Sequence, residues 1–200
     1  GHLARASLMA LDSESDGLHR FPEKVCLVQA AHPDGTVYLV DPLAFSALAP
    51  LGALCADPRL IKVLHGAAFD VAALKRDFRF AFRGVCDTMI AAQLLGLPDL
   101  GLNGLLAREL GVCPAPSRQK DDWSRRPLSP DQEIYAAGDV RHLIALREVL
   151  VARLRAKGRE PWLEEECREL EAAPALARSA DPASYLRLKG ARALDRRGLA

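Results

Sequence analysis

The fold is decided by the stretch Ser7-Leu8-Met9-Ala10-Leu11-Asp12-Ser13-Glu14. After Ser7 it is apolar on both alternating faces, which is typical of a strand buried inside a sheet. Because side chains alternate across a strand, Asp12 and Glu14 project from the same face and lie close together. Two like charges repel at this spacing, and burial adds to the cost unless a cation lies between them. The stretch therefore predicts a divalent metal ion at the end of a central strand.

The composition is that of an ordinary globular domain. The chain has 200 residues, 50% of them hydrophobic, which allows one core with a small appendage. The formal net charge of +1 means that any basic surface for nucleic acid is local. The five cysteines are scattered and form no C-x-x-C pair, which predicts buried thiols and excludes a disulfide framework or a cysteine zinc site. We find no apolar run of transmembrane length and no signal segment, so we expect a cytoplasmic location.

The order of the predicted elements is that of an α/β domain. Strands at 25–31 and 36–40 follow the first one, and His32-Pro33-Asp34-Gly35 between them is a hairpin signal, so the chain opens as an antiparallel meander. The proline-rich stretch 111–130 is predicted as an extended surface loop. Further strands are expected at 60–64 and 85–87, and helices at 42–56, 68–78, 88–95, 102–110, 131–157 and 162–173 and from 182 onward.

The long predicted helix at 131–157 carries an unusual aspartate. Ser129, with Pro130 and Gln132 after it, is a strong start signal for this helix. Asp139 falls in the middle of its apolar stripe, which also contains Tyr135, Leu143, Leu146, Leu150 and Leu154. A charge inside an apolar stripe needs a partner. Asp87 is predicted only to cap the following helix.

Four acids thus occupy positions that need explaining: Asp12 and Glu14 at a strand end, Asp70 at a helix start, and Asp139. Four carboxylates are able to hold two divalent ions about 4 Å apart, the arrangement that stabilises the attacking and leaving oxygens of phosphodiester cleavage. Tyr135 lies one helical turn from Asp139, so its hydroxyl is placed to orient and help deprotonate the attacking water. Each feature alone is common, and only the ordered set predicts a site.

The ordered set resembles the motifs of the ribonuclease D family, which are DEDD-type 3′–5′ exonucleases. Leu11-Asp12-Ser13-Glu14 is similar to the first motif, with serine where threonine is more usual. The second and third motifs are matched by Leu64-His65-Gly66-Ala67-Ala68-Phe69-Asp70 and Tyr135-Ala136-Ala137-Gly138-Asp139. The spacing of Tyr135 and Asp139 is that of the tyrosine branch, since the histidine branch would need histidine at Ile134. Residues 27–29, 87–88 and 119–128 also look like the family's, so the resemblance covers about residues 7–170.

The resemblance implies a ribonuclease H-like mixed sheet flanked by helices, with a short helical C-terminal extension. It implies an exonuclease domain at 1–157, followed at 158–200 by an extension leading toward an absent or truncated helicase-and-ribonuclease-D C-terminal domain. It also implies that Asp12, Glu14, Asp70 and Asp139 bind two Mg²⁺ or Mn²⁺ ions and act with Tyr135 in catalysis. The implied activity is the release of nucleoside 5′-monophosphates from the 3′ ends of tRNA or other structured RNA.

Substrate contacts and rival functions stay open at this stage. The expected partner is RNA with a free, single-stranded 3′ end, and we expect a monomer with no membrane partner and no organic cofactor. One rival is a DNA 3′–5′ exonuclease, since the same acids cleave either polymer, and another is a non-catalytic RNA-binding module. Loop residues are expected to stack on or pair with RNA, although a solvated loop, a strand cap at His65 or a core anchor at Trp123 would explain them as well: His19, Phe21, His65, Lys120, Trp123 and Arg126.

Overall fold

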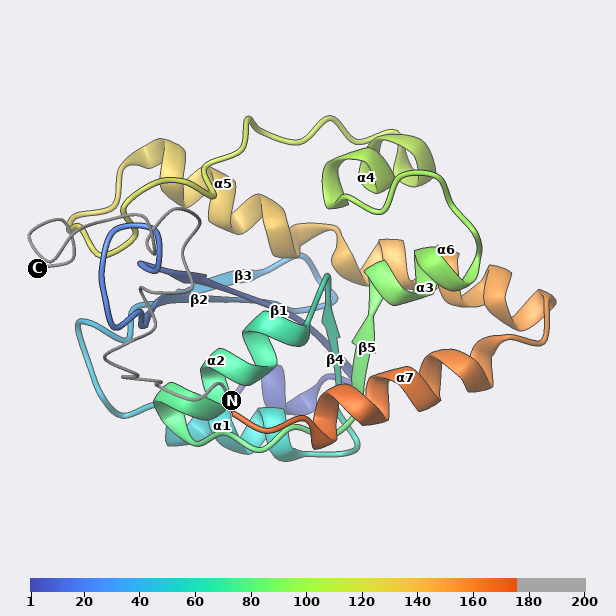
Figure 1. The fold of residues 1–200 in the computed structure, drawn as a ribbon, viewed down its shortest axis with the longest axis horizontal. Coiled ribbons are helices and arrows are strands. Elements are labelled where there is room, and N and C mark those ends of the chain that lie inside the picture. The colour runs from blue at the N-terminus through green and yellow to red at the C-terminus, as the bar shows by residue number, and fades with distance from the viewer. Residues whose placement is uncertain (176–200) are drawn as a thin grey trace, which may run out of the picture.

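The computed structural model describes residues 1–175 and contains one mixed five-stranded sheet flanked by helices (Figure 1). The order of strands across the sheet is β3-β2-β1-β4-β5. The β1–β2 and β2–β3 pairs are antiparallel, whereas β1–β4 and β4–β5 are parallel. This sheet confirms the predicted fold class. The strands are β1 (Leu8–Ser15), β2 (Val25–Ala31), β3 (Val37–Val40), β4 (Ile61–Leu64) and β5 (Val85–Asp87).

Strand β1 lies at the centre of the sheet because its apolar residues are buried on both faces. Met9, Ala10 and Leu11 have no exposed surface, as expected for a strand covered by helices on both sides. The predicted meander is also confirmed. The turn between β2 and β3 is closed by a 2.9 Å hydrogen bond from the His32 N–H to the Thr36 carbonyl, and Gly35 adopts φ +91° there.

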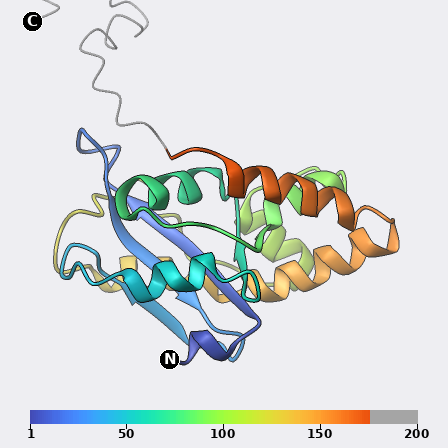
Figure 2. The same cartoon turned by 90° about the horizontal axis from the view of Figure 1, so that it is seen from below.

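Helices cover both faces of the sheet and its β5 edge. Figure 1 shows α5 on one side of the strands and α1 and α2 on the other, and Figure 2 shows the orange-red α7 meeting one end of the green α2. Helix α3 packs against α6 and α7 beside the parallel half of the sheet. The helices are the 3-10 turn η1 (Leu3–Arg5), α1 (Ala49–Ala56), α2 (Ala68–Phe78), α3 (Thr88–Leu94), α4 (Leu102–Leu110), α5 (Pro130–Arg141), α6 (Leu143–Ala156) and α7 (Glu160–Ala172).

Two predicted helices differ from the structure. The helix expected at 42–56 begins only at Ala49, after a turn in which Asp41 Oδ1 accepts the Leu43 N–H. The single helix expected at 131–157 is broken at His142, where φ is −110° and ψ −1°. The break lets α5 pack on β1, β2 and β3 while α6 packs on α3 and α4. Since no proline or glycine occupies position 142, the sequence pattern gave no sign of it.

The last described helix packs into the core. Leu163 and Cys167 of α7 are buried in the main hydrophobic cluster, and α7 contacts β5, α3 and α2. The boundary predicted at residue 157 stays a prediction, and the helix expected from residue 182 lies outside the described residues.

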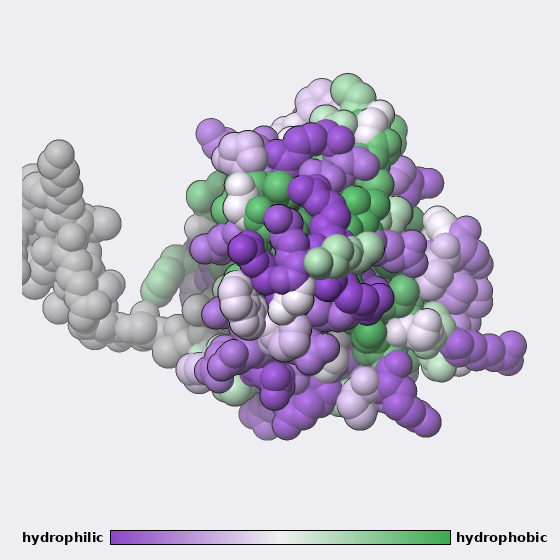
Figure 3. All heavy atoms as spheres, turned by 90° about the vertical axis from the view of Figure 1, so that its right-hand side faces the viewer, coloured by the Kyte–Doolittle hydropathy of each residue, from purple (hydrophilic) through white to green (hydrophobic). Residues whose placement is uncertain are grey.

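Of the described helices, none combines the length and the apolar character that crossing a membrane would need. Figure 3 shows one face of the molecule, on which hydrophilic residues predominate.

Candidate active site

The two acids of β1 stand at the end of its ladder, on the face covered by α5. Ala10, which shares this face because alternate residues of a strand do, packs against Val140 and Leu143 at the α5–α6 junction. The register of the β1–β2 pair shifts immediately after Glu14. An irregularity of this kind re-aims side chains at the end of a strand. Glu14 is only 8% exposed.

Helix α5 brings Asp139 and Tyr135 to the same point. It begins with the predicted capping box, in which Ser129 Oγ accepts from the Gln132 N–H and the Gln132 side chain accepts from the Ser129 N–H. Carboxylate oxygens of Asp12, Glu14 and Asp139 all lie within 4.8 Å of one another. The Tyr135 hydroxyl, one helical turn before, lies close enough to Asp139 to oppose the rise in the pKa of that carboxyl. The structure therefore gathers three of the four predicted acids into one group.

The fourth acid, Asp70, approaches from the first turn of α2. It lies outside the group of mutually close oxygens but is near enough for its charge to raise the pKa of Asp12 and Glu14. Ser13, between the two acids of β1, donates a 2.5 Å hydrogen bond from Oγ to Asp70 Oδ1. Asp70 is thus tied to β1 through a side chain that sequence reasoning did not single out.

A buried aspartate fixes the turn that leads into α2. Asp87 accepts from the backbone N–H groups of Gly66 at 3.0 Å and Ala67 at 2.7 Å. Gly66 has φ +68°, a conformation that favours glycine. The same carboxylate caps α3 by accepting from the Met89 N–H, which confirms the predicted capping role. Loss of the Asp87 carboxylate would leave backbone N–H groups at the starts of both α2 and α3 without their acceptor. Asp87 therefore helps to set the direction in which α2 presents Asp70.

The acids open into a cleft of about 580 Å³. One wall is the start of α4, and another is the loop between α4 and α5, which contributes Ser117 and Gln119. Of the residues that line the cleft, none is lysine or arginine. They are Asp12, Ser13, Glu14, His65, Phe69, Asp70, Asp99, Gly101, Leu102, Asn103, Gly104, Ser117, Gln119, Tyr135, Asp139 and Leu143.

Burial and mutual repulsion hold the acids of this cleft far from their ordinary titration range. Burial, reinforced by the charges of Asp139 and Asp70, raises the pKa of Glu14 to about 9. Burial raises the pKa of Asp139 to about 6, although the Tyr135 hydrogen bond opposes the rise. The pKa of Asp12 and that of Asp70 are also raised, chiefly by burial, and the Asp70 charge adds to the rise at Asp12. Within residues 1–175, the cleft lining thus supplies no lysine or arginine to stabilise these carboxylates.

The donor set fits a hard divalent cation. All the candidate ligands are carboxylate oxygens, which Mg²⁺ and Mn²⁺ prefer over the nitrogen and sulfur ligands of softer metals. Bound cations would offset the repulsion that raises the pKa values of Asp12 and Glu14. Asp12, Glu14 and Asp139 would hold one ion together, and Asp70 and Asp99 are the other acids that line the cleft.

Of the residues predicted to contact substrate, His65 lines the cleft. Its Nδ1 is 2.9 Å from the Thr88 hydroxyl, and burial lowers its pKa, so the ring is held in place at the edge of the acids. His19, Phe21 and Lys120 do not line the cleft. His19 instead contacts the Lys120 carbonyl through Nε2 at 2.9 Å, and Phe21 is 82% exposed on the same loop.

Trp123 and Arg126 both make structural contacts, and for Trp123 these match the core anchor that the sequence left open beside an RNA contact. Trp123 has no exposed surface and packs 6.2 Å from the Tyr135 ring, so it anchors the loop in the core. The Arg126 guanidinium pairs with Asp41 and donates to the carbonyls of Cys26 and Trp123. These bonds fasten the loop to β2, because Cys26 belongs to that strand.

Several cleft residues were missed by sequence reasoning. Phe69, Asn103, Ser117 and Gln119 carry no distinctive chemistry or spacing, and the loop around 117–119 was predicted to lie on the surface. Only Ser13 had a usable signal, because its side chain alternates with those of Asp12 and Glu14 and must point at whatever packs on the other face. Loop placement depends on contacts distant in sequence, which periodicity does not report.

Comparison with known proteins gives this geometry a family context. The sequence profile of a 3′–5′ exonuclease family matches residues 2–155. A curated relative, ribonuclease D of Desulfotalea psychrophila, is 31% identical over 192 residues, which is 96% of this chain and 51% of the relative. The chain spans about half the length of the curated relatives it matches.

Solved structures of the same kind superpose on this fold. The structure of Escherichia coli RNase D, described as an exoribonuclease involved in structured RNA processing, gives a TM-score of 0.81 at 28% identity, covering 99% of this chain and 52% of the other. Brucella melitensis NrnC bound to pGG gives 0.77 at 29% identity, covering 92% and 89%. The same protein with bound Mg²⁺ gives 0.76 at 30% identity, covering 92% and 89%.

Proposed function

We propose, from the premise that this chain belongs to the 3′–5′ exonuclease family, that it removes nucleotides from RNA 3′ ends by metal-dependent hydrolysis. The observation that carries the proposal is the meeting of Asp12, Glu14 and Asp139 within 4.8 Å, in a cleft that also contains Asp70 and Tyr135. Carboxylates at this separation are unfavourable without cations, and phosphodiester cleavage is the chemistry that paired divalent ions serve.

Each side chain has a role that its position supports. Asp12, Glu14 and Asp139 would hold the ions, with Asp70 as a further ligand steadied by Ser13. Two bound Mg²⁺ or Mn²⁺ ions would supply an activated water and neutralise the departing 3′ oxygen. Tyr135 would orient the attacking water through its hydroxyl, which already lies beside Asp139. His65, fixed by Thr88, stands where the terminal phosphate or sugar would enter.

The relatives support RNA as the substrate class. Ribonuclease D proteins from several bacteria are among the curated relatives, and the NrnC structure contains pGG. We propose an unpaired RNA 3′ end as the substrate, with tRNA or other structured RNA as its source. Because none of the described residues that line the cleft is lysine or arginine, the reacting phosphate would be recognised by the bound ions and by neutral donors such as Asn103 and Gln119.

The test is a degradation ladder. RNA with an unpaired 3′ end is labelled at the 5′ end in one sample and at the 3′ end in another, and incubated with Mg²⁺ or Mn²⁺. Stepwise shortening of the 5′ label and immediate release of a labelled mononucleotide from the 3′ end are expected. A DNA strand of the same sequence is run beside it. Faster shortening of the DNA would instead make the protein a DNA exonuclease, and binding without shortening would make it a binding module.

A matched pair of variants ties the activity to the site. Asp139→Asn removes a carboxylate of the cleft, whereas Glu133→Gln removes an exposed carboxylate from the same helix. We expect shortening to stop in Asp139→Asn and to continue in Glu133→Gln. Full activity in Asp139→Asn would refute the assignment of the metal ligands.

A further inference from the structure

A buried polar side chain of β2 has no hydrogen-bond partner. Gln29 is the only hydrophilic residue of this strand, whose sequence is Val-Cys-Leu-Val-Gln-Ala-Ala. It has no exposed surface, and within residues 1–175 neither its Nε2 nor its Oε1 has a hydrogen-bond partner. Burial of a carboxamide without a partner is unfavourable, and an apolar side chain would avoid that cost. Gln29 therefore needs a partner that the described residues do not supply in this arrangement.

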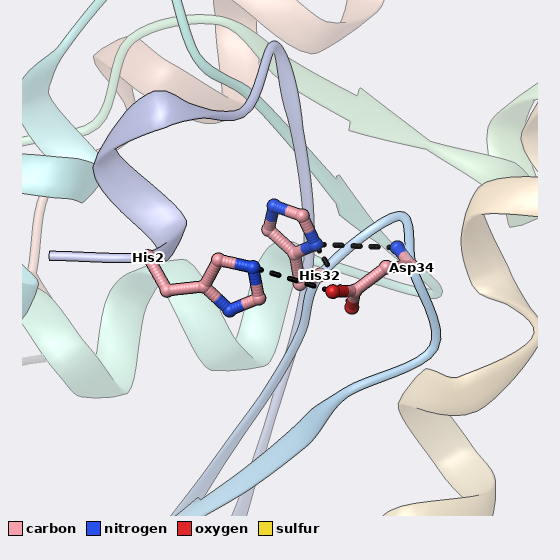
Figure 4. Close-up of side chains that lie close together, drawn as sticks. All are labelled: His2, His32 and Asp34. Carbon is pink, nitrogen blue, oxygen red and sulfur yellow. Dashed lines mark hydrogen bonds and ion pairs between the residues drawn. The ribbon is translucent and has the colours of Figure 1, made fainter.

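Polar side chains at the far end of the β1–β2 pair, in contrast, bond to one another. His2 Nε2 lies 3.2 Å from Asp34 Oδ2, and His32 Nδ1 accepts the Asp34 N–H at 3.2 Å (Figure 4). Asp34 Oδ1 also accepts the Thr36 N–H at 2.9 Å. His2 and Asp34 are exposed as well, so water is available to them. Gln29 differs from this group in being both buried and unpartnered.

The register of the sheet places Gln29 beside a candidate metal ligand. Gln29 lies directly opposite Asp12 of β1. Directly opposed residues project from the same face of a sheet, with Cβ atoms about 4.5–5.5 Å apart. Leu27 alternates onto this face too, and it is buried in one cluster with Tyr135 of α5. The Gln29 carboxamide thus lies beneath α5, on the side of the sheet that carries the acids, and a glutamine side chain is long enough to reach the Asp12 carboxylate.

We propose that Gln29 is a positioning residue, whose carboxamide N–H donates to the Asp12 carboxylate when that carboxylate binds a divalent ion. The inference rests on the proposed function, in which Asp12 is a metal ligand. A carboxylate that binds an ion through one oxygen keeps a second oxygen that accepts hydrogen bonds, and such bonds hold ligands in place. Because an ionised carboxylate only accepts, the N–H end of the amide is the end that turns toward it. Ser13 already acts in this way on Asp70, with Oγ 2.5 Å from Oδ1.

The experiment is a calorimetric titration of the full chain with Mn²⁺ in the absence of RNA. Gln29→Met keeps an unbranched side chain of similar length but removes the donor, and it is expected to weaken Mn²⁺ binding about 10-fold. In EDTA the same variant is expected to melt at or above the wild-type temperature, because it removes an unpartnered amide from the core. Val28→Ala is the matched control. Val28 is buried on the other face of β2, so this variant is expected to melt at a lower temperature and to bind Mn²⁺ as the wild type does.

A second readout uses the unaltered protein and does not depend on how the variants fold. The side-chain amide protons of Gln29, assigned in NMR spectra by their loss in Gln29→Met, are expected to shift downfield on addition of Mg²⁺, as amide protons do when they bond to a carboxylate. The amide signals of Gln93, which is exposed on α3, are expected to stay in place.

The outcomes separate this inference from the proposed function. A wild type that binds no Mn²⁺ would refute the metal site and both proposals with it. If the wild type binds Mn²⁺, three results would each overturn the role of Gln29 and leave the proposed function standing: equal affinity in Gln29→Met, an equal loss of affinity in Val28→Ala, or Gln29 amide signals that Mg²⁺ does not move.

Discussion

Among single residues, Asp139 shows how function and stability oppose each other in this site. Its carboxylate adds to the repulsion at Asp12 and Glu14, and burial raises its own pKa to about 6. Replacing it by asparagine keeps the shape and removes the charge. The metal-free Asp139→Asn protein is therefore expected to melt at a higher temperature than the wild type, while kcat/KM falls by more than about 100-fold, beyond what changes outside the ligands usually cause.

The measurement pairs thermal unfolding in EDTA with RNA hydrolysis in Mg²⁺. Glu133→Gln, on the exposed side of α5, is expected to change neither quantity. A lower melting temperature for metal-free Asp139→Asn would contradict the repulsion argument even if activity were lost.

The pH dependence of stability follows from the same acids. Glu14 and Asp139 have folded pKa values of about 9 and about 6, above their ordinary values of 4.5 and 3.8. Between the ordinary and the raised pKa of each group, the folded state binds more protons than the unfolded state. The contribution of Glu14 and Asp139 to the free energy of unfolding is therefore lost as the pH rises through their folded pKa values. In EDTA, the free energy of unfolding is expected to fall from pH 5 to pH 8 by more in the wild type than in Asp139→Asn. Urea unfolding checks this, and Mg²⁺ is expected to restore stability at pH 8 more than at pH 5.

A substitution at Tyr135 can separate the orientation of the attacking water from the binding of the metal ions. Its hydroxyl contacts Asp139 but is not a preferred ligand of Mg²⁺, so Tyr135→Phe removes a water-orienting group and keeps the carboxylates. We expect kcat to fall about 10²-fold, within the range of groups that assist proton transfer, while the Mg²⁺ concentration for half-maximal activity is unchanged. A large shift in that Mg²⁺ concentration would show that Tyr135 acts on the metal site instead.

At the residue scale, sequence reasoning worked where a side chain contradicted its surroundings. Asp12 and Asp139 stood out because each is an acid within an apolar pattern, and the structure places their carboxylates together. For Trp123 and Arg126 the sequence predicted a contact to RNA, with an anchor in the core left open for Trp123. Their burial and ion pairing depend on where the loop packs, which residue type alone does not determine.

At the scale of elements, α5 is the support of the site, and its start is open to a quantitative test. Ser129 Oγ accepts from the Gln132 N–H at 3.2 Å, and the Ser129 N–H donates to Gln132 Oε1 at 3.0 Å. Ser129→Ala removes the cap and is expected to lower the free energy of unfolding by about 1 kcal/mol. Ser129→Asp keeps an accepting oxygen and is expected to lose much less. Chemical denaturation of the three proteins provides the comparison, and equal stability of all three would show that the cap contributes nothing.

The elements themselves were largely predictable, because strand alternation and cap residues are local signals. Strands β1, β2 and β5 and helices α2 and α4 lie where the pattern placed them. The break between α5 and α6 was not predictable, since His142 is neither a helix breaker nor flanked by one. Tertiary packing produces it, because α5 follows the antiparallel strands and α6 turns toward α3 and α4.

For the molecule as a whole, the position of α7 leads to a prediction about the extent of the folded unit. Leu163 and Cys167 are buried in the main core, the Glu171 side chain accepts the Val85 N–H at 2.8 Å, and Lys75 donates to the Glu171 and Ala173 carbonyls. A chain that ends at residue 157 would expose the β5 edge and is expected to melt well below the intact chain. A chain that ends at residue 175 retains all of these contacts and is expected to match it. Calorimetry of the two truncations decides between a boundary at residue 157 and one beyond α7.

Among the described residues, none that lines the cleft carries an ammonium or guanidinium group, which bears on how the proposed reaction would end. A freed nucleoside monophosphate carries two negative charges on its phosphate, and the wall around it is made of carboxylates and neutral groups. Once the monophosphate had dissociated from the ions, repulsion by the carboxylates of the lining would push it out of the cleft. Under the proposed function, repulsion from the carboxylates would favour departure of the cleaved nucleotide, and inhibition by accumulated monophosphate is expected to be weak.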